Sequence, residues 1–245
     1  MRSIPLRNEK IMSLLERSLP LFGEHGIEKL NNSSVIVFGV GGVGSWCAEA
    51  LARCGVGSIT VVDGDVASET NRNRQLIALN SAINKPKSDL IAERIKDINP
   101  NCNVTAINLF YSAETMNEID LSEFDYIADC IDTVTSKLLL ITESSKANRP
   151  IISSMGTGNR LDPSKIAVKD IYSTSGDPLA RIMRKELRAR GVESLKVVFS
   201  EEAPKECVES RNEITGRATP SSAIFVPATA GLRMAYEIVK EIIEK

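Results

Sequence analysis

The stretch Val35-Ile36-Val37-Phe38-Gly39-Val40-Gly41-Gly42-Val43-Gly44 decides the fold of this chain. Its first four residues form a continuous apolar run, which is typical of a strand buried on both faces of a parallel sheet. Gly39, Gly41 and Gly44 then match the pattern G-x-G-x-x-G, and residues 45–52 continue as a helix. Glycine permits a sharp turn and lets phosphate approach the helix N-terminus. The stretch therefore predicts a strand–loop–helix unit that binds a nucleotide.

Outward from this unit, apolar runs and helical patterns alternate along the chain. Such alternation is typical of a parallel sheet with right-handed crossovers. The sequence thus predicts an α/β fold: a doubly wound, mostly parallel Rossmann-like sheet with helices on both faces. Further strands are expected at residues 59–62, 104–109, 126–128 and 150–152, and further helices at residues 1–30, 88–98 and 136–147.

The alternation loosens beyond about residue 155, and a C-terminal extension begins there. The extension is expected to close with an apolar-faced helix at residues 227–245. We expect a single domain over residues 1–245, with a nucleotide-binding core at about 30–155 and a substrate-side extension at about 156–245. Within the extension, strands are expected at residues 166–168 and 197–199, a basic helix at 177–190 and a polar loop at 201–222.

Composition excludes several classes of protein. The chain has 245 residues, 42% of them hydrophobic, and a formal net charge of −2. No apolar run approaches the roughly 20 residues that span a bilayer, and the N-terminus lacks the apolar region of a signal peptide. Five cysteines without any C-x-x-C pair argue against a disulfide framework and against a paired-cysteine zinc site. We therefore expect a cytoplasmic protein without membrane contact or zinc, and the single histidine argues against histidine-based catalysis.

Polar residues follow the second expected strand, where the phosphates of a nucleotide would lie. Asp63 stands at the spacing expected of an acid that binds ribose, and on this ground alone NAD would be the default ligand. Arg74 and Lys87 add positive charge, which suits a triphosphate better than a nicotinamide because guanidinium binds phosphate oxygens bidentately. A solvated surface is the alternative for these two cations. The polar candidates here are Asp63, Asp65, Asn71, Arg74, Gln75 and Lys87.

One further carboxylate follows the expected strand at residues 126–128. Asp132 lies at the carboxyl end of that strand, where open α/β sheets place their ligands. Mg²⁺ takes one or two protein carboxylates and keeps most of its waters, so Asp132 is a candidate for a magnesium ion that bridges phosphates. The alternative for Asp132 is a helix N-cap.

In combination these motifs resemble the adenylating superfamily of ubiquitin-activating-like proteins (ThiF, MoeB and HesA), and the resemblance covers nearly the whole chain. It implies ATP and Mg²⁺, with Asp132 holding the metal and with Arg74 and Lys87 acting on the phosphates. It also implies a homodimer in which Arg17 reaches the γ-phosphate across the interface, while an ordinary surface position for Arg17 stays open. The implied ATP-binding residues are Gly39, Gly41, Gly42, Gly44, Asp63, Asp65, Asn71, Arg74, Gln75, Lys87 and Asp132.

A narrower resemblance is to the tRNA threonylcarbamoyladenosine dehydratase branch of that superfamily. It implies an enzyme that uses ATP to dehydrate and cyclise the threonylcarbamoyl group on a tRNA adenosine next to the anticodon, by activating its carboxylate. The main alternative is adenylation of the C-terminus of a ubiquitin-like or sulfur-carrier protein; an NAD(P) oxidoreductase and an inactive nucleotide-binding scaffold are the others. The stretches that carry the resemblance are residues 43–53, 98–100, 156–163, 177–180, 198–202 and 225–228.

A tRNA substrate requires a basic surface, although the whole chain is slightly acidic. The candidates lie on the expected helix at residues 177–190, and a solvated helix face is the alternative. Cys207 in the expected loop suggests thioester or persulfide chemistry, and an incidental thiol is the favoured alternative. A cysteine desulfurase or other sulfur-acceptor system and a monovalent cation are left open. The tRNA candidates are Arg181, Arg184, Lys185 and Arg188, with Lys205, Arg211 and Arg217 in the loop that follows.

Overall fold

The computed structural model describes residues 14–206, 210–211 and 218–245. Its centre is a seven-stranded sheet in the order β3-β2-β1-β4-β5-β7-β6. Neighbouring strands are parallel except β6 and β7, so the predicted doubly wound, mostly parallel sheet is confirmed. The strands are β1 (Ser34–Phe38), β2 (Ser58–Val62), β3 (Asn103–Ile107), β4 (Tyr126–Asp129), β5 (Ile151–Ser154), β6 (Ile166–Asp170) and β7 (Lys196–Ser200).

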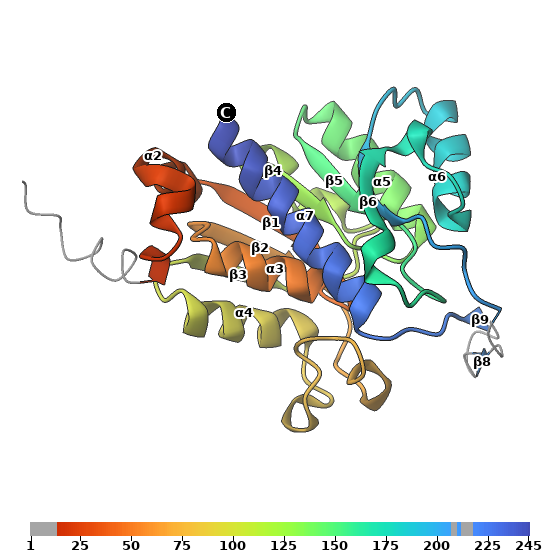
Figure 1. Cartoon of the computed structure of the whole chain (residues 1–245), viewed down its shortest axis with the longest axis horizontal. Coiled ribbons are helices and arrows are strands. Elements are labelled where there is room, and N and C mark those ends of the chain that lie inside the picture. The colour runs from red at the N-terminus through yellow and green to blue at the C-terminus, as the bar shows by residue number, and fades with distance from the viewer. Residues whose placement is uncertain (1–13, 207–209, 212–217) are drawn as a thin grey trace, which may run out of the picture.

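Helices cover both faces of the sheet, and α7 runs diagonally across one face beside α3 (Figure 1). Six α-helices are described: α2 (Leu19–Asn31), α3 (Gly44–Arg53), α4 (Lys87–Ile98), α5 (Val134–Lys146), α6 (Pro178–Ala189) and α7 (Phe225–Glu244). Short 3-10 turns occur at Glu69–Asn71, Asn80–Ala82, Met116–Glu118, Leu121–Glu123, Pro163–Lys165 and Ile171–Ser173.

Strand β1 shows why the apolar run in the sequence is continuous. Val35 and Val37 pack in a core with α3, α4 and α7, whereas Ile36 and Phe38 pack on the opposite face with residues of α5. All four side chains are fully buried. A central strand covered on both faces needs apolar residues at every position.

The N-terminal region differs from the continuous helix expected at residues 1–30. Inside α2, Gly23 has φ 70° and ψ 163°, a conformation that interrupts the helix and that glycine adopts without a steric penalty. Residues 1–13 lie outside the described part of the chain. The loop expected at 201–222 contains a short antiparallel pair, β8 (Ser210–Arg211) with β9 (Ala218–Thr219), and Cys207 and Arg217 lie outside the described residues.

Two glycines shape the turn between β1 and α3. Gly39 has φ +80°, and a Cβ there would lie 2.8 Å from the carbonyl oxygen of Cys130. A Cβ at Gly44 would lie only 1.8 Å from the carbonyl oxygen of Gly39. No other residue type fits either position, so the strand, the turn and the helix are packed as tightly as the motif predicts.

Candidate functional site

A cavity of about 270 Å³ opens where the strand order reverses, at the carboxyl ends of β1, β2 and β4. Open α/β sheets bind their ligands at this switch point. Its lining comes from the glycine loop, from the segments that follow β2, β3 and β4, and from two segments of the C-terminal extension. The polar and glycine residues of the lining include Gly39, Gly41, Gly42, Asp63, Asp65, Arg74, Gln75, Lys87, Asp132, Thr133, Ser136, Thr157 and Ser222.

The N-termini of two helices face this region. α3 begins at Gly44 directly after the cavity-lining residue Val43, and α5 begins at Val134 directly after Thr133. Neither N-cap residue forms a side-chain cap hydrogen bond. Because the first N–H groups of a helix carry partial positive charge and have no intrahelical acceptor, both ends favour an anion.

Gly41 and Gly42 are glycines that the fold itself does not require. A Cβ at Gly41 would have its nearest contact at 3.6 Å, and one at Gly42 would have its nearest at 3.4 Å; both are ordinary distances. Both residues line the cavity, so side chains there would occupy space at its wall. The lack of side chains at Gly41 and Gly42 is therefore explained by a ligand in the cavity and not by the fold. Close approach of phosphate to the backbone would require glycine at these positions.

Asp63 joins the glycine loop to the segment after β2. Its Oδ2 accepts a hydrogen bond of 2.8 Å from the Val40 N–H, and its Oδ1 accepts one of 2.8 Å from the Asp65 N–H. Burial raises the pKa of Asp63 above its ordinary value, and these hydrogen bonds and the charge of Lys87 offset only part of the rise. The carboxylate is therefore fixed in place at the cavity wall.

Charged groups surround the glycine loop. The Lys87 Nζ lies 2.9 Å from the Asp65 Oδ2, and Lys87 is buried whereas Asp65 is exposed. Burial lowers the pKa of Arg74, and the negative charge of Asp132 acts in the opposite direction. The Arg74 guanidinium also donates to the Thr70 carbonyl, which orients it. The cavity thus holds two cations and two exposed carboxylates, a set that can neutralise phosphates and bind a divalent cation.

A buried ion pair supports the loop that carries Asp132. The Lys137 Nζ lies 2.9 Å from the Asp129 Oδ2, and neither side chain is exposed. Ser153 donates to the same Asp129 oxygen at 2.6 Å. Sequence reasoning did not single out Lys137, because a lysine in a helix is usually solvated.

Most of the predicted site residues gather in one place. Gly44 lies beneath the turn, where it permits the close contact with Gly39. Two predicted residues stand elsewhere: Arg17 is exposed in a turn before α2, and the Asn71 Oδ1 accepts from the Ser68 N–H in a local capping interaction. Neither lines the cavity. Of the residues predicted to bind ATP, those that line the cavity are Gly39, Gly41, Gly42, Asp63, Asp65, Arg74, Gln75, Lys87 and Asp132.

Gln75 is buried, and its Oε1 has no hydrogen-bond partner among the described residues. A buried amide oxygen without a partner is costly, so an incoming ligand donor or water would stabilise it.

Sequence reasoning missed the aromatic and extension residues of the lining. Phe110 and Tyr111 follow β3, and Phe110 is 64% exposed. Thr157, Ser222 and Pro227 reach the cavity from the C-terminal extension. Large aromatic residues soon after a strand are a usable signal, since strand ends face the ligand. Thr157 and Pro227 lie in stretches 156–163 and 225–228, which carry the family resemblance, but nothing in those stretches indicated a place in the cavity wall.

The basic residues of α6 differ in whether their side chains contact the rest of the fold. Arg184 is half-buried and donates to the carbonyl and the hydroxyl of Thr174, so its guanidinium holds a turn of the fold. The Arg188 guanidinium lies 5.1 Å from the centre of the Tyr172 ring. Arg181 and Lys185 are exposed. Their side chains are the most available for an external anion.

The cysteines of the core are inert. Cys47 is fully buried, and burial raises its pKa to about 12. Burial also raises the pKa of Cys130 well above its ordinary value. Both thiols are therefore protonated at neutral pH and unsuited to nucleophilic attack.

Two further properties of the described residues concern metals and membranes. Within the described ranges, histidine, cysteine and carboxylate side chains form no group of three or more that could hold a metal ion by themselves. A magnesium ion here would share its coordination with ligand phosphates. Helices in the described part of the chain are all too short or too polar to cross a membrane.

The fold and the cavity define a class: a Rossmann-like nucleotide-binding protein with cations and carboxylates around the glycine loop. The chain belongs to the ThiF family, whose model matches residues 15–244. It is 43% identical over 232 residues to the tRNA threonylcarbamoyladenosine dehydratase of Bacillus subtilis, an alignment that covers 91% of each protein. It also superposes on crystal structures of the E. coli dehydratase TcdA, with a TM-score of 0.87 and 33% identity for the AMP complex and 0.84 and 32% for the ATP complex. Each superposition covers 95% of both chains.

Proposed function

We propose that this protein is an ATP-dependent tRNA threonylcarbamoyladenosine dehydratase. The observation that carries the proposal is the convergence of Arg74, Lys87 and Asp132 on a glycine loop whose middle glycines the fold does not need. The similarity to named dehydratases over nearly the full chain supports the same activity. We also propose that residues 1–245 work as one unit, because α7 of the extension packs against α3 of the nucleotide-binding core.

The chemistry begins with a poor electrophile. The free carboxylate of the threonylcarbamoyl group cannot expel oxide, so one of its oxygens attacks the α-phosphorus of ATP and pyrophosphate leaves. The neighbouring carbamoyl group then attacks the acyl carbon, closes a five-membered ring and expels AMP, while its proton passes to solvent. The oxygen lost from the carboxylate leaves with AMP, so the nucleoside loses one water in total.

The residues of this chain position the substrates and neutralise phosphate charge, and they do not transfer protons. Arg74 and Lys87 offset the phosphate charge, and Asp63 accepts hydrogen bonds from the ribose hydroxyls. We propose that Asp132 holds a Mg²⁺ ion, which supplies charge neutralisation on the leaving pyrophosphate when bound. Ring closure is intramolecular, and proximity of this kind supplies roughly 7–11 kcal/mol in favourable systems. A chain with a single histidine suits this division of work.

The position of Arg17 bears on the oligomeric state. Because Arg17 lies outside the cavity of its own chain, we propose that it acts on the phosphates bound by a second copy in a homodimer. For a tRNA-modifying enzyme we propose a cytoplasmic location. No observation on the described residues favours a monovalent cation or a sulfur-transfer partner, and neither is part of the proposal.

The test uses purified protein, ATP, Mg²⁺ and tRNA that carries threonylcarbamoyladenosine. We expect AMP release and a nucleoside mass lower by one water, with both lost in Asp132→Ala. Asp89→Ala, an exposed carboxylate on α4, is the matched control and should behave as wild type. ATP consumption that requires a small carrier protein and leaves the nucleoside unchanged would instead support the carrier-adenylating alternative and overturn the proposal.

A further inference from the structure

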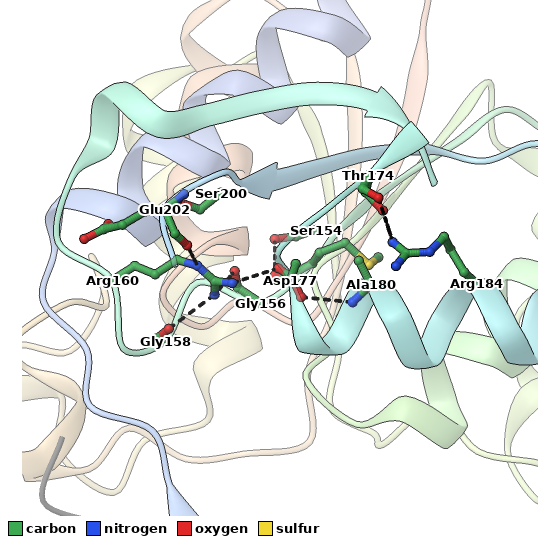
Figure 2. Close-up of polar contacts among 11 residues, drawn as sticks. Ser154, Gly156, Gly158, Arg160, Thr174, Asp177, Ala180, Arg184, Ser200 and Glu202 are labelled. Atoms are coloured by element: carbon green, nitrogen blue, oxygen red, sulfur yellow. Dashed lines mark hydrogen bonds and ion pairs between the residues drawn. The ribbon is translucent and has the colours of Figure 1, made fainter. Parts of the chain in front are cut away.

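A buried arginine lies next to the cavity in the loop between β5 and β6. Arg160 is 5% exposed, and Figure 2 shows its guanidinium at the centre of a polar network. Its Nη1 donates to the carbonyl oxygens of Gly156 at 2.7 Å and of Gly158 at 3.3 Å. Its Nε donates to the carbonyl oxygen of Glu202 at 3.0 Å. One side chain therefore ties together three points of the backbone.

Two of these points flank a residue of the cavity wall. Thr157, which lines the cavity, lies between Gly156 and Gly158. A Cβ at Gly158 would lie 2.6 Å from Pro220, so the loop packs tightly against the segment that contributes Ser222 to the same wall. The position of Thr157 is thus fixed on both sides.

The same arginine reaches the basic helix. Its Nη2 lies 3.3 Å from the Oδ2 of Asp177, which is 2% exposed. Asp177 is the N-cap of α6, and its Oδ1 accepts from the Ala180 N–H at 2.9 Å. Arg160 and Asp177 therefore join the start of α6 to the cavity wall (Figure 2).

Glu202, whose carbonyl Arg160 contacts, also binds the loop through its side chain. The Glu202 Oε2 accepts hydrogen bonds of 2.8 Å from the N–H groups of both Leu161 and Asp162. The guanidinium and this carboxylate thus hold the loop between them. Burying charge to tie a loop is costly compared with apolar packing, so the network is explained by the geometry it fixes more than by stability.

We propose that Arg160 is a positioning residue for the RNA side of the reaction. It fixes the Thr157 wall relative to α6, so that a tRNA held on α6 presents its modified nucleotide to the cavity. This inference rests on the proposed dehydratase function. Because the glycine loop and Asp63 come from other segments, loss of Arg160 should affect the RNA substrate and leave ATP binding intact.

The experiment compares Arg160→Met and Arg160→Lys with wild type in steady-state assays. We expect Arg160→Met to raise the KM for tRNA about tenfold and lower kcat, with the KM for ATP changed by less than about twofold. Arg160→Lys keeps the charge beside Asp177 and should recover part of the loss. Lys169→Met is the matched control, because it removes an exposed ion pair with the neighbouring Glu201 and should behave as wild type.

A second variant covers the case in which Arg160→Met does not fold. Asp177→Asn keeps the acceptor for the Ala180 N–H, removes the charge that faces Arg160, and should raise the KM for tRNA in the same way. An unchanged KM for tRNA, or an equal rise in both KM values, overturns the proposal.

Hydrogen exchange separates this inference from the proposed function. In Arg160→Met, the amides of residues 156–162 should exchange faster, while those of β1 and α3 stay as in wild type. Unchanged exchange in residues 156–162 overturns the positioning role. Wild-type protein that fails to dehydrate the tRNA overturns the proposed function instead, and the exchange result still decides whether Arg160 orders the loop.

Discussion

Lys137 and Asp129 form a fully buried ion pair that holds both backbone polar groups of one residue between them. The Asp129 Oδ1 accepts from the Ile131 N–H at 3.1 Å, and the Lys137 Nζ donates to the Ile131 carbonyl at 3.0 Å. Ile131 is the residue before Asp132. The pair therefore fixes the backbone from which the proposed magnesium carboxylate projects.

Replacing one partner should be far worse than replacing both. Lys137→Met leaves Asp129 buried without its counter-charge, and we expect a loss of about 3–5 kcal/mol in the free energy of unfolding. The double variant Lys137→Met, Asp129→Asn should recover most of that stability, because no buried charge remains. Urea denaturation of the two variants measures both values. A single variant within about 1 kcal/mol of wild type would contradict the prediction.

We expect the double variant to fold yet turn over slowly. Its loop no longer has two charged anchors, so Asp132 should bind Mg²⁺ less well. The half-saturating Mg²⁺ concentration of the ATP-dependent reaction measures this effect. Wild-type magnesium dependence in a folded double variant would show that the pair serves stability alone.

The glycine loop offers a contrast between two alanine substitutions. Gly44→Ala places a Cβ 1.8 Å from a backbone oxygen and should prevent stable folding. Gly41→Ala meets its nearest atom at 3.6 Å, so its stability should stay within about 1 kcal/mol of wild type. The Gly41 variant should nevertheless bind ATP more weakly, because its methyl group stands at the cavity wall. Thermal unfolding with and without ATP tests both, and undiminished ATP stabilisation of Gly41→Ala would argue against a phosphate at this loop.

The raised pKa of Asp63 predicts how nucleoside binding depends on pH. In the proposed complex the ionised Asp63 carboxylate would accept hydrogen bonds from ribose, so affinity should be full well above its pKa and fall as pH drops through it. Because burial raises that pKa, the loss should begin at a higher pH than for an exposed aspartate. Titration calorimetry with adenosine, which has no phosphate to titrate, measures this dependence. Asp63→Asn should bind more weakly and without the pH dependence.

Much of this architecture could be predicted because its signals are local. Four apolar residues followed by glycines mark β1 and its turn, and the carboxyl ends of parallel strands bring Asp63 and Asp132 together wherever the loops run. The same logic placed Asn71 in the site, but its side chain forms a hydrogen bond within its own turn. This local hydrogen bond explains why the Asn71 side chain does not line the cavity, and its contact with phosphate stays a prediction.

The remaining features depend on contacts between distant segments. Lys137 and Arg160 resemble surface cations in the sequence, since nothing nearby indicates that a carboxylate from another element will meet them in the interior. Thr157 and Ser222 reach the cavity because two loops pack against each other, and such packing leaves no periodic signal. Of these residues, Thr157 and Ser222 are the ones that bring the extension to the cavity of the predicted nucleotide core.

Glu49 provides a stability prediction away from the cavity. Burial raises the pKa of Glu49, but hydrogen bonds from Arg94 and Arg53 outweigh this and leave the pKa below its ordinary value. A carboxylate with a lowered pKa contributes stability above the pKa of its unfolded form, and that contribution is lost as pH falls through the folded pKa. Glu49→Gln should cost about 1–3 kcal/mol at neutral pH and progressively less in acid. Urea denaturation across that pH range measures the difference, and a constant difference would contradict it.

Charge reversal on α6 tests where the tRNA backbone lies. Arg181 and Lys185 are exposed one helical turn apart, whereas Arg184 is committed to Thr174, so the double variant Arg181→Glu, Lys185→Glu changes the surface and leaves the fold intact. We expect weaker tRNA binding, and a slope of log affinity against log salt that is shallower by about two, because each lost phosphate contact removes about one unit. ATP affinity should not change. Lys146→Glu on α5, an exposed lysine paired with Glu143, is the control and should retain the wild-type slope. An unchanged slope in the α6 variant would place the RNA on another face of the molecule.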